Sequence, residues 1–470
     1  MTSVSEATAI AVLSATELLR RYRTTELSPV EATRAVLAQI DRHNPRVNAY
    51  CLVDHDRALE QAKASERRWR QGKPTGRLDG VPVAIKDVFL THGWPTLRGS
   101  RAIDPEQPWE EDAPAVARLR ANGAVLIGKT TTPELGWKGV TDSPLTGVTR
   151  NPWDPALTAG GSSGGSAVAV VLGMAPLALG TDGGGSIRIP AAFSGLVGHK
   201  PTYGRVAQWP PSPFGSLAHA GPMAWTVVDA ALMLDVIAAP DPRDWSAAPA
   251  ENLSYLDELA GGVVGLRVAF SPTLGYVQVD PEVAAAVQQA AKTFEALGAQ
   301  VEQADPGFED PVGIFEVLWY AGAAKAVERL GERALPVLDP GLREISDIGR
   351  TYSAMDYLEA ESRRAKLGGH LGQFHQRFDL LLTPTLPVPA FVAGQEVPDG
   401  WPGRRWMSWT PFTYPFNLTQ QPAASVPCGF TAAGLPIGLQ IVGAKYADAL
   451  VLRAAHAYQT AQPGTDRRPS

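Results

Sequence analysis

A stretch rich in glycine and serine, flanked by apolar segments, constrains this chain more than any other feature. Nine glycines lie between Gly160 and Ser186, eight of them in the sequences GGSSGGS and GTDGGGS. Tracts of this kind often form flexible linkers. Here the neighbouring segments AVAVVLGMAPLALG and IRIPAAFSGLVG are strongly apolar, so we expect the serines to be held inside a core. A buried hydroxyl needs a hydrogen-bond partner, which favours a polar network at these serines.

The three residues before Ser186 are suited to binding a developing negative charge. Gly183, Gly184 and Gly185 precede it, and glycine allows several backbone N–H groups to turn toward one point. Converging N–H groups form the oxyanion hole of acyl-transfer enzymes. We therefore expect Ser186 to lie beside its own charge-stabilising donors, the amides of these residues.

Lys86 follows the apolar run VPVAI, which we interpret as a β-strand. Burial at the end of such a strand would favour the neutral amine, which can act as a base. The alternative is a lysine that extends to water or pairs with Asp87. This segment alone favours the simpler alternative.

Two further patterns match known motifs without the structural context that those motifs need. Residues 123–130, GAVLIGKT, match the phosphate-binding loop pattern, but their aliphatic middle indicates a buried strand instead. Residues 161–165, GSSGG, match the nucleophile elbow of α/β-hydrolases, with Ser163 as the nucleophile. An elbow follows a strand directly, whereas here two prolines and a Thr-Ala-Gly turn precede it. The elbow stays open as the alternative serine-hydrolase mechanism.

The run from Gly160 to Pro201, together with VPVAIKD and GLPIGLQIVG, closely resembles the amidase signature family, and the similarity covers nearly the whole chain. The resemblance implies a Ser-Ser-Lys triad in which Ser186 attacks, Ser162 bridges and Lys86 is the base. The reaction it implies is hydrolysis of linear C–N amide bonds through an acyl-enzyme, with esters or carbamates as further substrates. It also implies a cis peptide bond before the bridging serine.

Three residues are expected to support this triad. Ser163 is expected to join the hydrogen-bond network, while Asp182 and Arg188 are expected to pair and brace the loop. The sequence departs from the family pattern at Ala159, where proline is frequent, and at Gly183, where threonine or isoleucine is common. We expect Gly183 to widen the oxyanion pocket or to loosen its loop.

Short apolar runs that alternate with helical patterns predict an α/β fold, with a mixed central β-sheet and helices on both faces. We expect one amidase domain over residues 1–470. Within it we predict a helical N-terminal segment at 1–75, a catalytic core at 78–240, and a helical insertion or lid over the substrate pocket at 308–410. The apolar stretch 167–180 is expected to be a buried core helix.

Composition limits the partners of the chain. A formal net charge of -6 argues against nucleic acid, whose binding proteins cluster lysine and arginine. Two cysteines exclude a disulfide framework and fit a reducing cytoplasm, and the N-terminus lacks the pattern of a signal peptide. We therefore predict a cytoplasmic monomer or homodimer that acts on a small-molecule amide, with no cofactor, metal, nucleic acid or membrane partner.

The substrate is specified least. Among 12 tryptophans, Trp401, Trp406 and Trp409 form a cluster, and Trp137 and Trp209 lie in segments near the catalytic motifs. We predict that Trp137 and Trp209 line a pocket for aryl or hydrophobic amides. Packing of the tryptophans against a proline-rich loop is the alternative. The sequence shows no evident arginine for binding a carboxylate.

Two other functions are compatible with the same resemblance. The A subunit of the aminoacyl-tRNA amidotransferase has the same triad but releases ammonia from glutamine within a complex. That subunit usually has Arg-Gln-Pro after its nucleophile, whereas here Arg188 is followed by Ile189 and Pro190. This difference favours a free-standing bacterial amidase. A catalytically inactive scaffold is disfavoured because all three triad positions are intact.

Overall fold

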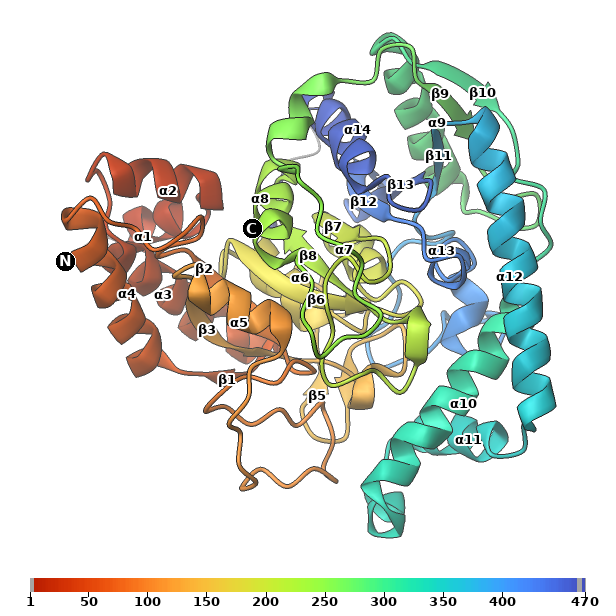
Figure 1. Ribbon diagram of the computed structural model, residues 1–470, viewed down its shortest axis with the longest axis horizontal. Helices are drawn as coiled ribbons and strands as arrows, with labels where there is room; N and C mark the ends of the chain where they lie inside the picture. Colours follow the sequence, from red (N-terminus) through yellow and green to blue (C-terminus); the bar gives the residue numbers. More distant parts are fainter. Residues whose placement is uncertain (1–3, 463–466, 470) are drawn as a thin grey trace.

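The computed structural model describes residues 4–462 and 467–469, and one mixed β-sheet runs through the molecule (Figure 1). Its 11 strands lie in the order β1 (Tyr50–Val53), β3 (Val125–Thr130), β2 (Pro82–Lys86), β6 (Leu177–Asp182), β8 (His219–Ala224), β7 (Val197–Lys200), β12 (Ala423–Phe430), β13 (Pro436–Gly443), β11 (Leu380–Pro384), β9 (Arg267–Phe270) and β10 (Gln300–Gln303). A small hairpin is formed by β4 (Asp142–Ser143) and β5 (Gly147–Val148).

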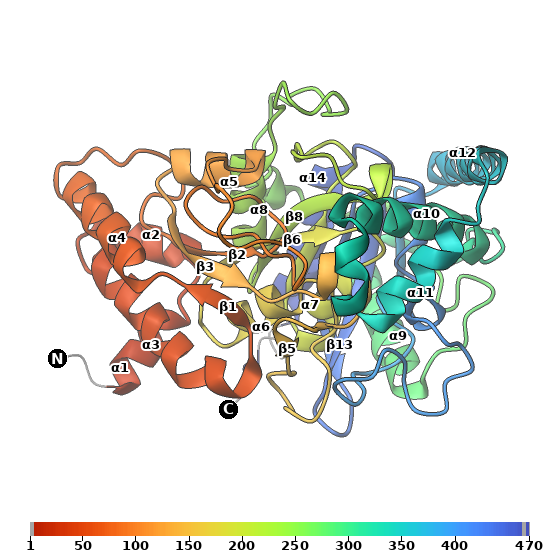
Figure 2. The same cartoon turned by 90° about the horizontal axis from the view of Figure 1, so that it is seen from below.

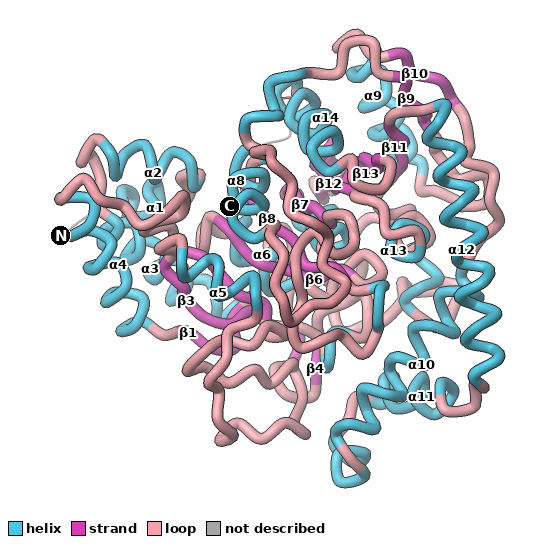
Figure 3. The backbone as a smooth tube through the Cα atoms, viewed as in Figure 1, coloured by secondary structure: helices cyan, strands magenta, loops and turns pink. Residues whose placement is uncertain are grey.

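Helices surround the sheet and are distributed along the whole chain (Figure 3). They are α1 (Val4–Ala11), α2 (Ala15–Arg23), α3 (Pro29–Val47), α4 (His55–Arg70), α5 (Pro114–Ala121), α6 (Gly164–Val171), α7 (Arg188–Ser194), α8 (Val227–Ile237), α9 (Pro281–Ala296), α10 (Val312–Leu330), α11 (Pro340–Gly349), α12 (Ala354–Arg377), α13 (Pro415–Leu418) and α14 (Asp448–Ala461). Within the described residues, no helix has the length and apolar character needed to cross a membrane.

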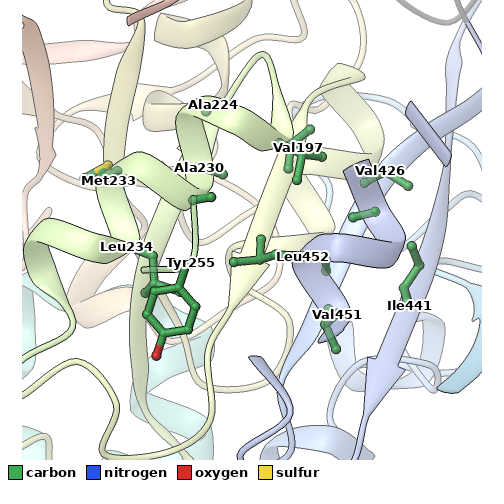
Figure 4. Close-up of a cluster of buried hydrophobic side chains, with 14 of the residues drawn as sticks. Val197, Ala224, Ala230, Met233, Leu234, Tyr255, Val426, Ile441, Val451 and Leu452 are labelled. Atoms are coloured by element: carbon green, nitrogen blue, oxygen red, sulfur yellow. The ribbon is translucent and has the colours of Figure 1, made fainter. Parts of the chain in front are cut away.

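Both faces of the sheet are buried, as the alternation of side chains along a strand requires. In β2, Val83 and Ile85 belong to the core cluster that contains α5, α8, α9 and α14, whereas Ala84 belongs to the cluster that contains α3 and α6. Figure 4 shows part of the first cluster, where Leu234 of α8 and Leu452 of α14 lie over the sheet. The predicted mixed sheet with helices on both faces is confirmed.

The N-terminal segment is helical with one exception. Ser28 caps α3: its side chain accepts from the Glu31 amide and the Glu31 side chain accepts from the Ser28 amide, as the sequence pattern indicates. The exception is β1, an antiparallel edge strand that pairs with β3. Figure 2 shows α1–α4 at one end of the molecule and α10–α12 toward the other.

The apolar stretch 167–180 is not one helix, contrary to the expectation. Helix α6 ends at Val171, and β6 begins at Leu177. Gly173 between them has a φ of +67°, a conformation that glycine adopts readily, and Pro176 cannot continue a helix. The turn shortens the helix and allows the chain to return as a buried strand.

Residues 308–410 are helical only in part. Helices α10, α11 and α12 fill the first part, but β11 follows them and lies inside the sheet, antiparallel to β13 and parallel to β9. The strand order divides the sheet into two halves, one from β1 to β7 and one from β12 to β10. The halves meet where β7 pairs with β12 at three positions: Lys200 with Ala423, His199 with Ala424 and Gly198 with Ser425.

Candidate active site

The site lies where two parallel neighbouring strands end. Lys86 is the last residue of β2, and Asp182 is the last residue of β6, immediately before the glycines that lead to Ser186. Because parallel strands have their carboxyl ends at the same edge, the lysine and the glycine loop meet there. Ser162 and Ser163 come from the loop before α6. The Gly161–Ser162 peptide bond is cis.

Lys86 is fully buried among hydroxyl groups. Its Nζ lies 2.6 Å from Ser162 Oγ, 2.8 Å from Thr181 Oγ1 and 2.9 Å from Ser163 Oγ. Burial lowers the pKa of Lys86 well below its ordinary value, although the charge of Asp182 opposes this shift. The simpler interpretation from the sequence is wrong, because Lys86 does not reach water and Asp87 pairs with Lys129 instead.

Ser186 is brought to the same cavity but is not linked to the other hydroxyls. Its backbone carbonyl accepts from the Ser163 amide at 3.1 Å, which fixes the two loops together. Its side chain lines a cavity that Ser162 and Thr181 also line. Within the described residues, the Ser186 hydroxyl makes no hydrogen bond, so the step from Ser162 to Ser186 is open in this structure.

The glycine loop offers fewer free amides than the sequence suggests. The Gly185 amide donates to Asp182 Oδ1 at 2.7 Å, so the prediction that Gly185 contributes an oxyanion donor is wrong in this structure. The amides of Gly183, Gly184 and Ser186 have no hydrogen-bond acceptor in the described chain. These three amides remain free to bind a developing oxyanion.

Asp182 and Arg188 form the expected ion pair. Arg188 Nε and Nη2 each lie 2.9 Å from one carboxylate oxygen of Asp182, and both side chains are fully buried. Other Arg188 donors bind Thr413 O at 3.0 Å, Gln440 Oε1 at 2.8 Å and Asn417 Oδ1 at 2.6 Å. Burial alone would raise the pKa of Asp182, but the Arg188 charge outweighs it and holds that pKa below its usual range. The nucleophile loop is therefore tied to the C-terminal part of the chain.

One of the two predicted pocket tryptophans lines the cavity. Trp209 does, next to Gln208 and the proline-rich segment 210–213. Trp137 does not, because it is fully buried and packs against α11, where a Cβ on Gly341 would lie 2.6 Å from its ring. The aromatic cluster that contains Trp406 and Trp409 is likewise packed in the core.

Sequence reasoning missed the contribution of α10 to the cavity. Trp319 stacks on Phe214 with ring centroids 3.9 Å apart, and both residues line the cavity. A Cβ on Gly183 would lie 2.8 Å from the Trp319 ring, so the indole fills the space that a side chain at 183 would take. Arg98 and Arg329 also line the cavity. No local pattern in the sequence marks these residues.

Neither the phosphate-binding loop nor the nucleophile elbow forms the structure that its motif requires. Residues 125–130 form the buried strand β3, and Lys129 Nζ donates to Phe89 O at 2.6 Å. No strand directly precedes Ser163, which is the N-cap of α6, so the elbow geometry does not form. Among residues 4–462 and 467–469, no group of three or more His, Cys, Asp or Glu side chains is arranged to hold a metal ion.

Comparison with known proteins places the chain among amide-hydrolysing enzymes. An acylamidase from Rhodococcus erythropolis is 39% identical over 465 residues, which cover 97% of each chain. The A subunit of the glutamyl-tRNA(Gln) amidotransferase from Chloroflexus aurantiacus is 38% identical over 469 residues, with 94% of this chain and 95% of that one covered. A solved bacterial aryl acylamidase of the amidase signature family has a TM-score of 0.89 and 32% identity, over 96% of both chains.

A family model described as amidase matches residues 31–452. This range includes both serine loops, the strand that carries Lys86, and all 11 strands of the large sheet. The relatives cover almost the full length of the chain, and the resemblance found in the sequence motifs is confirmed. The protein therefore belongs to the amidase family, whose amidase signature members it resembles in sequence and fold.

Proposed function

We propose that this protein is a serine amidohydrolase that cleaves C–N amide bonds, with Ser186 as nucleophile, Ser162 as proton relay and Lys86 as base. One observation carries the proposal: a fully buried lysine, in an environment that favours its neutral form, lies 2.6 Å from Ser162 Oγ beside the cavity that contains Ser186. A base, a relay and a hydroxyl that lines the cavity, in this order, are the requirements for an activated serine.

In the proposed mechanism, Lys86 takes a proton from Ser186 through the Ser162 hydroxyl while Ser186 Oγ attacks the amide carbonyl. The amides of Gly183, Gly184 and Ser186 bind the oxyanion. The C–N bond then breaks, and the proton on Lys86 passes back through Ser162 to the leaving amine. Water attacks the resulting acyl-enzyme and loses its proton to the same relay. The bond between the acyl group and Ser186 Oγ then breaks, the relay returns the proton to Oγ, and the carboxylic acid product leaves.

The open step between Ser162 and Ser186 is compatible with this mechanism. Catalytic hydrogen bonds are often long or misaligned without substrate and tighten in the complex. Ser163 supports the arrangement, because its hydroxyl donates to Thr181 O at 3.1 Å and accepts from Lys86. Asp182 and Arg188 hold the loop but do not touch the cavity.

For the substrate, we propose aryl or hydrophobic amides, with esters and carbamates as side substrates. Phe89, Trp209, Phe214 and Trp319 give the cavity an aromatic lining. Acylamidases among the relatives support this class. We further propose that α10–α12 act as the wall or lid of the cavity, since α10 supplies Trp319 to it.

A glutamine-hydrolysing component of an amidotransferase is the second candidate, favoured by the 38% identical relative. The sequence Arg188-Ile189-Pro190 argues against it, because that component usually has glutamine in the middle position. Turnover of glutamine by the isolated chain would favour this second candidate over a free-standing amidase.

Labelling with a serine-directed fluorophosphonate tests the nucleophile. Intact mass is compared for the wild type, Ser186→Ala, Ser162→Ala and Ser163→Ala, and each protein is assayed on an anilide, an ester, a carbamate and glutamine. We expect Ser186→Ala to abolish both label and turnover, and Ser163→Ala to retain the label. If Ser163→Ala alone abolishes both, Ser163 is the nucleophile and the proposed triad is wrong.

A further inference from the structure

Two arginines line the cavity without a partner. In the part of the chain that the structure describes, neither Arg98 nor Arg329 makes an ion pair or a side-chain hydrogen bond. No aspartate or glutamate is among the described residues that line the cavity. The cavity therefore combines an aromatic lining with two positive charges that no protein carboxylate neutralises.

The nearest carboxylates are already engaged. Asp87 lies close enough to influence Arg98, but it pairs with Lys129 at 3.5 Å and accepts hydrogen bonds from backbone amides of the Arg98 loop. Glu328, beside Arg329 in α10, pairs with Lys325 at 2.6 Å. Neither carboxylate is available to pair with the two arginines.

Arg98 is held in a costly state. Its side chain is partly buried, and this burial lowers its pKa, with the charge of Asp87 opposing the shift and that of Arg329 adding to it. Its backbone adopts a φ of +54°, which non-glycine residues rarely take and which is frequent at functional sites. By contrast, the buried Arg188 has all its donors directed at protein acceptors. A partly buried cation without such acceptors is suited to an anion supplied from outside.

The distance from the two arginines to the loop that carries Ser186 determines how long a ligand must be to reach both places. The Arg98 carbonyl accepts from the Leu135 amide at 2.7 Å, beside Gly136 and near Ser162. Arg329 lies ten residues beyond Trp319 in α10, a distance of about 15 Å along a helix axis. Since Trp319 packs against Gly183, Arg329 belongs to the end of the cavity that is remote from the oxyanion amides.

We propose that Arg98 and Arg329 form a subsite for a carboxylate, so that the preferred substrates are aryl or hydrophobic amides that carry a carboxylate remote from the scissile bond. This inference rests on the proposed serine amidohydrolase function. The planar guanidinium binds a carboxylate through two parallel hydrogen bonds, and the aromatic lining of the same cavity accommodates the apolar part of the substrate.

Matched substrate pairs test the subsite. One pair is octanoyl p-nitroanilide and its analogue with a carboxylate at the far end of the acyl chain. The second pair is an N-hexanoyl aniline with either a methyl or a carboxylate at the para position of the ring. We expect the wild type to show a higher kcat/KM for the carboxylate in at least one pair, and added salt to weaken that preference.

Arg98→Gln and Arg329→Gln remove the charges. The matched control is Arg333→Gln, an exposed arginine four residues after Arg329 that does not line the cavity. We expect each arginine variant to lower kcat/KM for the preferred carboxylate about tenfold, and to leave the neutral partner within about twofold. Arg329 is exposed at the end of α10, so its replacement should not unfold the chain. No preference in the wild type, a preference kept by both variants, or an equal loss on both partners would overturn the subsite.

The measurements distinguish a failure of the proposed amidohydrolase function from a failure of the proposed carboxylate subsite. If Ser186→Ala still hydrolyses the neutral anilides, the proposed function is wrong. If Ser186→Ala is inactive and the neutral anilides are turned over normally without an arginine-dependent carboxylate preference, only the subsite is wrong.

Discussion

At the scale of single residues, the environment of Lys86 determines the chemistry. Three hydroxyl groups contact its amine, and within the described residues no carboxylate lies in ion-pair contact with it. A hydroxyl group can accept a hydrogen bond from a charged amine or donate one to a neutral amine. These three hydroxyl groups can therefore bind either protonation state of Lys86. Burial then decides in favour of the neutral form.

This environment predicts the pH dependence of the reaction. In the proposed mechanism the neutral amine is the active form. We therefore expect kcat/KM to fall on the acid side as Lys86 becomes protonated, and the lowered pKa to keep the enzyme active well below pH 10.5, the ordinary pKa of lysine. Thr181→Val removes one acceptor for the charged amine, which lowers the pKa further. We expect its acid limb to move to lower pH in profiles of kcat/KM on a neutral anilide. A shift to higher pH would contradict this role of Lys86.

At the scale of elements, the loop after β6 and helix α10 fit each other. Gly183 has no side chain, and Trp319 occupies the space that one would need. The same indole donates to Trp137 O at 3.0 Å, so it cannot move without breaking this bond. The residue at 183 and the residue at 319 are therefore coupled, although they lie far apart in the sequence.

A double-mutant cycle measures this coupling. Gly183→Thr places atoms against the Trp319 ring, and overpacking of this kind costs about 1–3 kcal/mol. We expect reduced thermal stability and reduced kcat/KM, and partial recovery of both when Trp319→Leu is added. Gly313→Ala is the control, because a Cβ there meets nothing within 4 Å. Strictly additive effects would show that the two residues are not coupled.

Local patterns in the sequence identify some elements and not others. Strands β2, β3 and β9 each contain a run of three apolar residues, whereas small residues, glycine and proline interrupt the apolar pattern of β8 and β12. The residues of the proposed triad lie in segments that resemble the motifs of the amidase signature family. Trp319, Arg98 and Arg329 reach the cavity only through tertiary packing, which no local spacing records.

At the scale of the whole molecule, one buried network joins distant parts of the chain. Arg188 and Asp182 flank Ser186 in the sequence, while Asn417 from α13 and Gln440 from β13 bind Arg188. Asn417 also donates to Asp182 Oδ1 at 2.9 Å. The position of the Ser186 loop therefore depends on residues contributed by the other half of the sheet.

Replacement of Arg188 tests the weight of this network. Arg188→Met leaves Asp182 buried without its cation, which costs about 3–5 kcal/mol of unfolding free energy. In the wild type, the pKa of Asp182 in the folded chain is lower than its ordinary value of 3.8. This shift adds stability at pH values above 3.8, and the added stability disappears as the pH falls through the folded pKa. We expect the melting-temperature difference between wild type and variant to widen as pH rises from 3 to 6.

The exposed pair of Arg243 with Asp241 supplies the control for this experiment. Arg243→Met should change the unfolding free energy by less than about 1 kcal/mol at any pH in that range. A pH-independent loss in Arg188→Met would mean that packing, and not charge pairing, is the main contribution of Arg188.

The narrow contact between β7 and β12 also has a use in engineering. Lys86, Ser162 and Ser186 all lie before residue 261 in the sequence, whereas Trp319, Asn417 and Gln440 lie after it. A break between Gly261 and Gly262 falls in the loop before β9, where a Cβ on Gly262 would meet nothing within 4 Å. One of the two polypeptides would then carry Ser186, and the other would carry Asn417 and Gln440, which bind Arg188 near it. Release of a chromogenic amine would then report their reassembly, which makes this fold a candidate for a split-enzyme sensor of proximity.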